Sequence, residues 1–198
     1  MKSFTILVCL IVTSAGLLLF LQTTPVAVSD SGAPAAKELH YQVQEKTDSV
    51  LETESYLVLD IMTGDILFAH QEDTVRPIAS ITKLFTAATT LAHGNLSTPT
   101  TINAADVATE GRFGKLQAGE EYKVRDLLWP LLLESSNDAA VALARSSDID
   151  LVDLINRDVT QALPGTTLHL DDTSGLSPDN VASAADLAVA VSYLYHQE

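Results

Sequence analysis

Hydrophobic residues follow three different patterns along this chain. A nearly unbroken apolar run extends from Phe4 to Leu21, directly after Lys2, and residues 23–50 are mostly polar. From residue 51 onward, apolar positions first alternate as in strands and later recur every three or four residues as in helices. We therefore divide the chain into an apolar segment (1–22), a linker (23–50) and a folded domain (51–198).

The N-terminal apolar run predicts export of the domain. A short positive start followed by an apolar stretch is typical of a secretory signal. The run is also close to the minimum length of a membrane span, so an uncleaved anchor stays open as an alternative. Ala33-Pro34-Ala35 is a candidate cleavage site, although it lies far from the run. We expect residues 1–22 to be a signal peptide or membrane anchor, and the domain to lie in the cell envelope, in the periplasm or on the outer face of the cytoplasmic membrane.

Within the folded domain, a strand hairpin precedes a mostly helical region. Residues 55–60 and 66–70 alternate as strands around the turn signal Thr63-Gly64-Asp65. Helical spacing follows over residues 79–92, where Ile81, Leu84, Phe85, Ala88 and Leu91 would form the core-facing side. Further helices are expected over residues 124–133, 138–145, 151–163 and 184–195, with Pro130 kinking or splitting the first of these. This order predicts an α+β fold.

Composition excludes several classes of function. Apolar residues make up 46% of the chain, which is enough for a globular core. The formal net charge is -15 with 11 Lys and Arg, so a nucleic-acid partner is not expected. The single cysteine, Cys9, lies in the apolar run, and the five histidines are scattered. We therefore expect no metal site and no cofactor.

The first candidate for chemistry is the pair Ser80 and Lys83. Residues three apart on a helix share one face, so the hydroxyl and the amine would lie together. A serine becomes nucleophilic when a nearby base takes its proton, and a lysine of lowered pKa can be that base. Ser80 also begins its helix, where free N–H groups favour negative charge. A capping serine and a surface lysine would give the same spacing, so this motif alone does not decide.

A second candidate is Ser135-Ser136-Asn137, at a corner between two predicted helices. A serine hydroxyl and an asparagine amide at such a corner are able to point at one ligand. The alternative is a simple loop and N-cap cluster, because serine and asparagine favour both positions.

Together these motifs resemble those of the D-alanyl-D-alanine carboxypeptidases, which are low-molecular-mass penicillin-binding proteins and serine peptidases. The motif set of β-lactamases and penicillin-binding proteins is S-x-x-K, S-D-N and K-T-G. Ser136 stands in this chain where β-lactamases commonly have the aspartate of the second motif. The segments V-L-D-I-M-T-G-D-I-L-F-A-H and R-P-I-A-S-I-T-K-L-F-T-A are similar to the first strand pair and nucleophile helix of that family. G-K-L-Q-A-G-E-E-Y-K-V-R-D-L-L, L-L-L-E-S-S-N-D-A-A-V-A-L-A, T-S-G-L-S-P-D-N and A-S-A-A-D-L-A continue the resemblance in the same order.

The resemblance implies a β-lactamase/penicillin-binding transpeptidase-like fold and specific roles for four residues. Ser80 would be the acylated nucleophile and Lys83 its base, Ser135 would pass a proton to the leaving amine, and Asn137 would bind the substrate carbonyl. The implied substrates are peptidoglycan stem peptides, and β-lactam antibiotics would be covalent inhibitors. Ser174 and Asn180 would shape a loop.

The chain departs from the family pattern in one respect. No lysine follows Lys123, so the K-T-G motif and its strand are not present. We expect a catalytic domain truncated before that motif, because the apolar helical pattern at Tyr193-Leu194-Tyr195 reaches almost to the last residue. Such a chain should have little carboxypeptidase activity of its own, because in the family the K-T-G strand binds the substrate carboxylate and donates one of the two N–H groups to the oxyanion. The alternatives are a genuinely short, non-catalytic module that binds cell-wall peptides and, less favoured because of Ser136, a serine β-lactamase.

Overall fold

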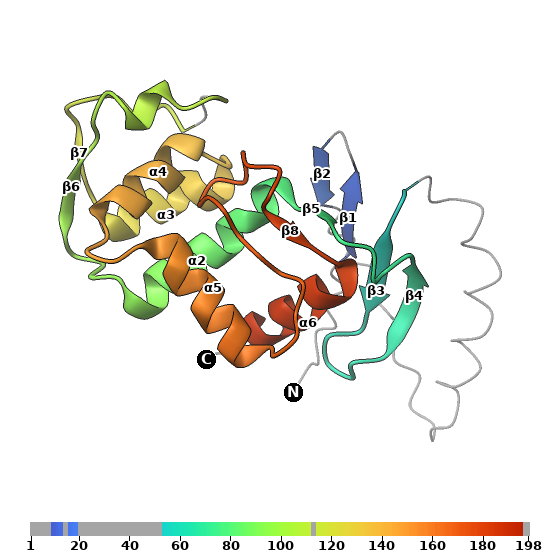
Figure 1. Cartoon of the computed structure of the whole chain (residues 1–198). Coiled ribbons are helices and arrows are strands. Elements are labelled where there is room, and N and C mark those ends of the chain that lie inside the picture. The colour runs from blue at the N-terminus through green and yellow to red at the C-terminus, as the bar shows by residue number, and fades with distance from the viewer. Residues whose placement is uncertain (1–8, 14–15, 20–52, 112–113, 196–198) are drawn as a thin grey trace, which may run out of the picture. The chain divides into compact units, whose positions relative to one another are not determined.

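The computed structural model describes residues 9–13, 16–19, 53–111 and 114–195 (Figure 1). The chain divides into two compact units, Met1–Thr74 and Val75–Glu198. The first unit contains a four-stranded sheet, and the second contains the helices. Strands therefore precede helices along the chain, as expected of an α+β fold.

The sheet of the first unit contains the hairpin predicted from the alternating pattern. Strand β3 (Tyr56–Leu59) pairs antiparallel with β4 (Ile66–His70). The turn between them is closed by a 2.7 Å hydrogen bond from the N–H of Gly64 to the carbonyl of Asp60, with Gly64 at φ 74°. The predicted hairpin is therefore confirmed.

Two further strands lie within the N-terminal apolar run. Strands β1 (Cys9–Thr13) and β2 (Gly16–Leu19) extend the sheet in the order β2-β1-β3-β4. The rest of the run and the linker lie outside the described residues. Among the helices that the structure describes, none combines the length and the hydropathy that a membrane crossing requires. The assignment of residues 1–22 to a signal peptide or anchor stays a prediction.

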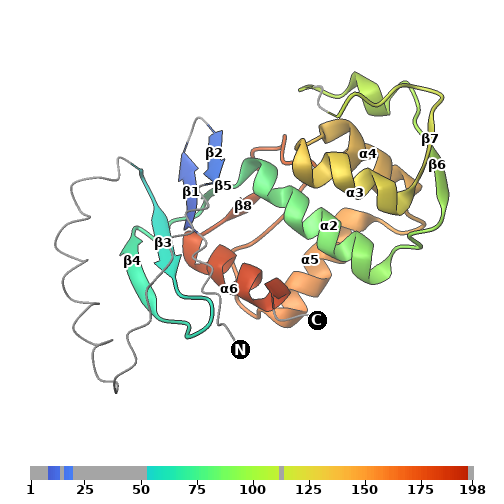
Figure 2. The same cartoon turned by 180° about the vertical axis from the view of Figure 1, so that it is seen from behind.

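In the second unit, helix α2 lies among the other helices (Figures 1 and 2). It contacts α3, α4 and α5. The elements are η1 (Ala79–Ile81), α2 (Thr82–His93), η2 (Asp106–Ala108), α3 (Val124–Leu133), α4 (Asn137–Ser146), α5 (Leu151–Ala162) and α6 (Ala184–Tyr195). Every helix expected from the sequence is present, with ends that differ by a few residues.

Short antiparallel ladders connect the loops of this unit. Strand β5 (Arg76–Pro77) pairs with β8 (Val181–Ala182), and β6 (Pro99–Thr101) pairs with β7 (Glu121–Lys123). These strands were not predicted from the sequence, because segments of two or three residues are too short to show an alternating pattern. The β5–β8 ladder brings the residues before η1 next to the loop formed by residues 172–180.

Helix α3 is continuous through Pro130, so the expected splitting of this helix is wrong. Leu127 and Leu131 lie on either side of the proline and are fully buried in one core. The residues before and after the proline therefore pack into the same core. The carbonyl of Pro130 then accepts the N–H groups of Glu134 and Ser136, which ends the helix.

The expected core-facing side of α2 is only partly correct. Ile81 and Phe85 are buried as expected, but Leu84 is 39% exposed and Leu91 is 54% exposed. The helix is therefore rotated relative to the simple apolar pattern.

Threonines and a lysine occupy the buried side of α2 instead. Thr82, Lys83 and Thr86 are nearly inaccessible to solvent. Burial of hydroxyls is tolerated because each has a partner: Thr86 Oγ1 donates to the carbonyl of Thr173 at 2.8 Å, and Thr82 Oγ1 accepts from Asn180 at 3.1 Å. Thr82 and Thr86 thus face the 172–180 loop. Their hydrogen bonds, and not the apolar spacing, determine which side of α2 is buried.

Candidate active site

Ser80 lies on the strained turn that begins α2. The preceding residue, Ala79, has a positive φ of 48°, which is uncommon outside glycine. Gly175 in the 172–180 loop packs directly against the carbonyl of Ala79, and a Cβ atom on Gly175 would lie 2.0 Å from that oxygen. A side chain at residue 175 is therefore incompatible with this turn. The close approach fixes the loop against the turn that presents Ser80.

The amine of Lys83 has three polar partners from three separate segments. Lys83 Nζ lies 3.2 Å from Ser80 Oγ, 2.7 Å from Asn137 Oδ1 and 2.5 Å from the carbonyl oxygen of Ser174. The Lys83 side chain is 2% exposed. The expected contact between the serine and the lysine is present, and the second motif contributes Asn137 to the same group.

The chemistry of these partners determines how a neutral Lys83 would be arranged. A neutral amine has two N–H donors and one lone pair. The oxygens of Asn137 and Ser174 are acceptors only, so both N–H groups are needed for them. The lone pair then faces Ser80, whose hydroxyl is able to donate a proton. The arrangement is thus suited to removal of a proton from Ser80.

The protonation equilibrium of Lys83 is shifted in the same direction. Burial of the ammonium lowers the pKa of Lys83 from 10.5 to about 8, against the opposing influence of the negative charge of Asp172. Desolvation disfavours the charged form of an amine. A neutral amine is therefore accessible near physiological pH.

Asn137, the first residue of α4, is held by both ends of its amide. Its Oδ1 accepts from Lys83, and its Nδ2 donates to the carbonyl of Glu110 at 2.7 Å. A second contact from Nδ2, to the carbonyl of Gly111, is long at 3.5 Å. One N–H of the amide is thus firmly bound to main-chain oxygen, and the other is only weakly engaged.

The two serines of the second motif have different environments. Ser136 is buried and caps α4, its hydroxyl accepting the N–H of Ala139 at 3.1 Å. Ser135 is half-buried and adopts a positive φ of 54°, a strained conformation for this residue type. In the part of the chain that the structure describes, no hydrogen bond joins the Ser135 hydroxyl to Ser80 or Lys83. The structure therefore brings Ser80, Lys83 and Asn137 into contact, and Ser135 lies two residues from Asn137.

Asp172 was not among the residues predicted from the sequence. Asn180, which is fully buried, accepts the main-chain N–H groups of Asp171 and Asp172 at 2.6 and 3.0 Å. Asp172 in turn binds the loop that presents the Ser174 carbonyl to Lys83. The role of Asn180 in shaping this loop agrees with what the family resemblance implied. Asp172 carried no signal in the sequence beyond its place just before T-S-G-L.

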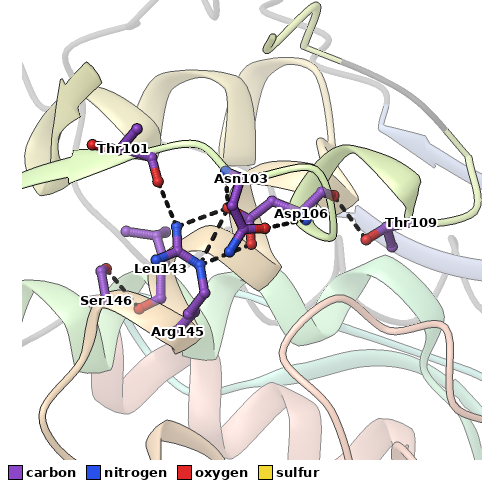
Figure 3. Close-up of polar contacts among 7 residues, drawn as sticks. All are labelled: Thr101, Asn103, Asp106, Thr109, Leu143, Arg145 and Ser146. Carbon is purple, nitrogen blue, oxygen red and sulfur yellow. Dashed lines mark hydrogen bonds and ion pairs between the residues drawn. The ribbon is translucent and has the colours of Figure 1, made fainter. Parts of the chain in front are cut away.

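A second buried charge, the carboxylate of Asp106, is bound at the opposite end of α4 (Figure 3). Arg145 binds the fully buried carboxylate of Asp106 through two nitrogens, Nε at 3.0 Å and Nη2 at 2.7 Å, and Nη2 also donates to the carbonyl of Thr101 at 2.7 Å. Asp106 and Asn103 exchange hydrogen bonds from main-chain N–H to side-chain oxygen, each of 2.9 Å. This cluster fastens to α4 the segment that leads to Glu110.

Comparison with known proteins identifies the family. Residues 41–198 match the D-alanyl-D-alanine carboxypeptidase family of peptidases. A D-alanyl-D-alanine endopeptidase of Haemophilus influenzae is 32% identical over 144 residues, which cover 71% of this chain and 49% of that protein. DacD, a D-alanyl-D-alanine carboxypeptidase of Escherichia coli, is 32% identical over 162 residues, covering 73% of this chain and 41% of that protein.

A solved structure gives the same result. The D-alanyl-D-alanine carboxypeptidase of Mycobacterium tuberculosis superposes with a TM-score of 0.64 at 28% identity, covering 71% of this chain and 55% of that one. The predicted α+β, penicillin-binding type of fold is thus confirmed. The chain spans about half the length of the curated relatives it matches. On these matches, the chain belongs to the D-alanyl-D-alanine carboxypeptidase family.

Proposed function

We propose that this chain carries the nucleophile of a serine peptidase that removes the terminal D-alanine from peptidoglycan stem peptides. The observation that supports this most directly is the contact of Lys83 Nζ with both Ser80 Oγ and Asn137 Oδ1 in a buried site. A nucleophile, its base and a group that orients the base are the elements that covalent acyl transfer requires. Penicillins would acylate the same serine as substrate analogues.

In the proposed reaction, Ser80 Oγ attacks the carbonyl carbon of the peptide bond before the last D-alanine. The hydroxyl proton moves to the lone pair of Lys83, and the carbonyl oxygen takes the negative charge of the tetrahedral intermediate. The C–N bond then breaks, and D-alanine leaves as an amine after accepting a proton. Water later attacks the Ser80 ester, which releases the shortened peptide and restores the serine hydroxyl.

Ser135 and Asn137 have separate roles in this proposal. Ser135 passes the proton from Lys83 toward the departing amine. Asn137 keeps its Oδ1 on Lys83 and offers the weakly engaged N–H of its Nδ2 to a peptide carbonyl of the substrate. Substrate would therefore bind along the edge of α4 that carries the second motif.

A fluorescent penicillin tests this function. The protein is expressed from its own gene, so that any residues beyond those printed are included, and labelling is followed on gels over time. We expect stable labelling that Ser80→Ala abolishes, whereas Ser97→Ala, at an exposed serine, leaves it unchanged. Rapid loss of the label would indicate a β-lactamase. A folded protein that never becomes labelled would instead favour the non-catalytic module that binds cell-wall peptides.

We also propose that the domain acts outside the cytoplasmic membrane. The support is the sequence of Lys2 followed by the apolar run to Leu21. A C-terminal reporter that functions only after export should be active, and deletion of residues 1–22 should abolish its activity. A reporter active only in the cytoplasm would contradict this location.

A further inference from the structure

The carboxylate of Asp172 lies at the centre of the turn that faces Lys83. Its Oδ1 accepts the main-chain N–H groups of Ser174 and Gly175 at 2.7 and 2.6 Å, and its Oδ2 accepts that of Ser177 at 2.6 Å. These bonds to the charged form hold the pKa of Asp172 below its usual range, although burial acts in the opposite direction. Asp172 is therefore an anion inside the turn at neutral pH.

The same turn directs a main-chain oxygen at the lysine. The carbonyl of Ser174 accepts from Lys83 Nζ at 2.5 Å, while the N–H of Ser174 donates to Asp172. One peptide segment therefore connects the carboxylate to the amine without a direct ion pair. We propose that Asp172 is a positioning residue: it holds the 174–177 turn over Lys83 and supplies the negative charge that the lysine ammonium faces. The proposal rests on the proposed function, in which Lys83 is the base.

The other groups around Lys83 do not supply a comparable charge. From the η1 turn the partner is the neutral hydroxyl of Ser80, and from α4 it is the neutral amide of Asn137. Asp138, the next residue of α4, is a buried carboxyl, but the charge that raises the pKa of Lys83 is that of Asp172. The remaining carboxyls near these contacts, Asp171 and Asp179 in the loop and Glu110 beside Asn137, are exposed.

Two influences of opposite sign thus act on Lys83. Burial favours the neutral amine, and Asp172 favours the ammonium. Removing only the charge should lower the pKa of Lys83 further. Opening the turn should instead hydrate the amine and raise the pKa toward its value in water. The direction of the change therefore separates an electrostatic role of Asp172 from a merely structural one.

The experiment is an NMR titration of the chain with ¹³C,¹⁵N-labelled lysine between pH 6 and pH 10. The Nζ signal of Lys83 is assigned by its loss in Lys83→Arg. In Asp172→Asn we expect the midpoint of Lys83 to fall by about half a pH unit or more. The matched control Asp171→Asn removes an exposed carboxylate one residue away and should leave the midpoint unchanged. An unchanged or raised midpoint in folded Asp172→Asn would overturn the electrostatic part of the proposal, that Asp172 supplies the charge that Lys83 faces.

A second variant covers the case in which Asp172→Asn does not fold. In Lys83→Met, the carboxyl carbon of Asp172 is titrated by ¹³C NMR. Because the coupling of two charges is reciprocal, loss of the lysine charge should raise the pKa of Asp172 by a similar amount. No change would overturn the proposal. Neither measurement requires activity, so a failure here is distinct from the absence of penicillin labelling, which concerns the proposed function.

Discussion

Helix α4 connects two charged side chains that the protein treats in opposite ways, a buried lysine and a partly exposed arginine that pairs with a buried carboxylate. At its beginning, Asn137 contacts Lys83, a cation whose hydrogen-bond partners are all neutral oxygens. At its end, Arg145 binds the carboxylate of Asp106 directly through two nitrogens. The pKa of Lys83 is lowered to about 8, whereas hydrogen bonding to Asp106 raises the pKa of Arg145.

This difference distinguishes a reactive group from a structural one. A directly paired charge is locked in its ionised form, so it holds segments together but does not exchange protons. A buried cation without a contacting anion is destabilised relative to its neutral form, so it readily gives up and takes back a proton. Lys83 has the second character and Arg145 has the first. Four changes test whether the distinction holds.

The largest expected effect is on the chemistry of Lys83→Met. Loss of a general base reduces a rate by about 10²- to 10⁴-fold, and we expect penicillin acylation of the protein to slow by that factor. The free energy of unfolding should not decrease, because an apolar chain of similar length replaces a poorly compensated cation. Acylation kinetics and urea denaturation measure the two quantities. If Lys83→Met lowered the free energy of unfolding without slowing acylation, Lys83 would be a structural charge and not a reactive one.

Arg145→Met should have the opposite profile. It leaves the fully buried carboxylate of Asp106 without its cation, and we expect a loss of about 3 kcal/mol in the free energy of unfolding, at the lower end of the range because Arg145 is partly exposed. Urea denaturation measures this loss. Arg157→Met, at an exposed pair with Asp158, is the control and should change stability by about 0.5 kcal/mol or less.

The pH dependence of acylation is the third test. Because the proposed base is the neutral form of Lys83, the rate should rise about tenfold per pH unit below the pKa of about 8 and level off above it. The same group affects stability. Between pH 8 and 10.5 the unfolded chain binds more protons at this lysine than the folded one, so its contribution to stability rises with pH in that window.

Lys83→Met should abolish that rise in stability. Stopped-flow acylation from pH 6 to pH 9, with thermal unfolding at each pH as the control, provides the measurement. A rate independent of pH across this range would count against Lys83 as the base.

The sequence predicted the hairpin, the helices and the pairing of Ser80 with Lys83, because each depends on local spacing. A separation of three residues places two side chains on one helix face regardless of the rest of the fold. The family resemblance added Asn137, which spacing alone could not join to Lys83 across 54 positions. The catalytic roles of these residues, and that of Ser135, stay predictions.

The features that could not be predicted depend on long-range polar contacts. The buried Thr82 and Thr86 of α2 have partners in the 172–180 loop, about ninety residues later in the chain. The apolar pattern therefore placed Leu84 and Leu91 in the core, where the structure has them exposed. Likewise, Asp106 and Arg145 are 39 residues apart, and no local sequence pattern links them. Their pairing could therefore not be predicted from the sequence.

The smallest expected effect is that of Arg145→Lys, which keeps the charge but removes the planar group. A lysine ammonium is a point charge and cannot bind Asp106 through two parallel bonds while also reaching the carbonyl of Thr101. We expect a loss of about 1–2 kcal/mol in the free energy of unfolding, less than for Arg145→Met, because the ion pair survives and roughly one hydrogen bond to a charged group does not.

Acylation by Arg145→Lys should stay within a factor of about three of the parent rate, because a change of this size at the far end of α4 leaves the contact of Asn137 with Lys83 in place. Urea denaturation and penicillin labelling of the same preparation decide the outcome. If Arg145→Lys slows acylation as much as Lys83→Met does, Lys83 and Arg145 act as one unit, and the division into a structural and a reactive charge is wrong.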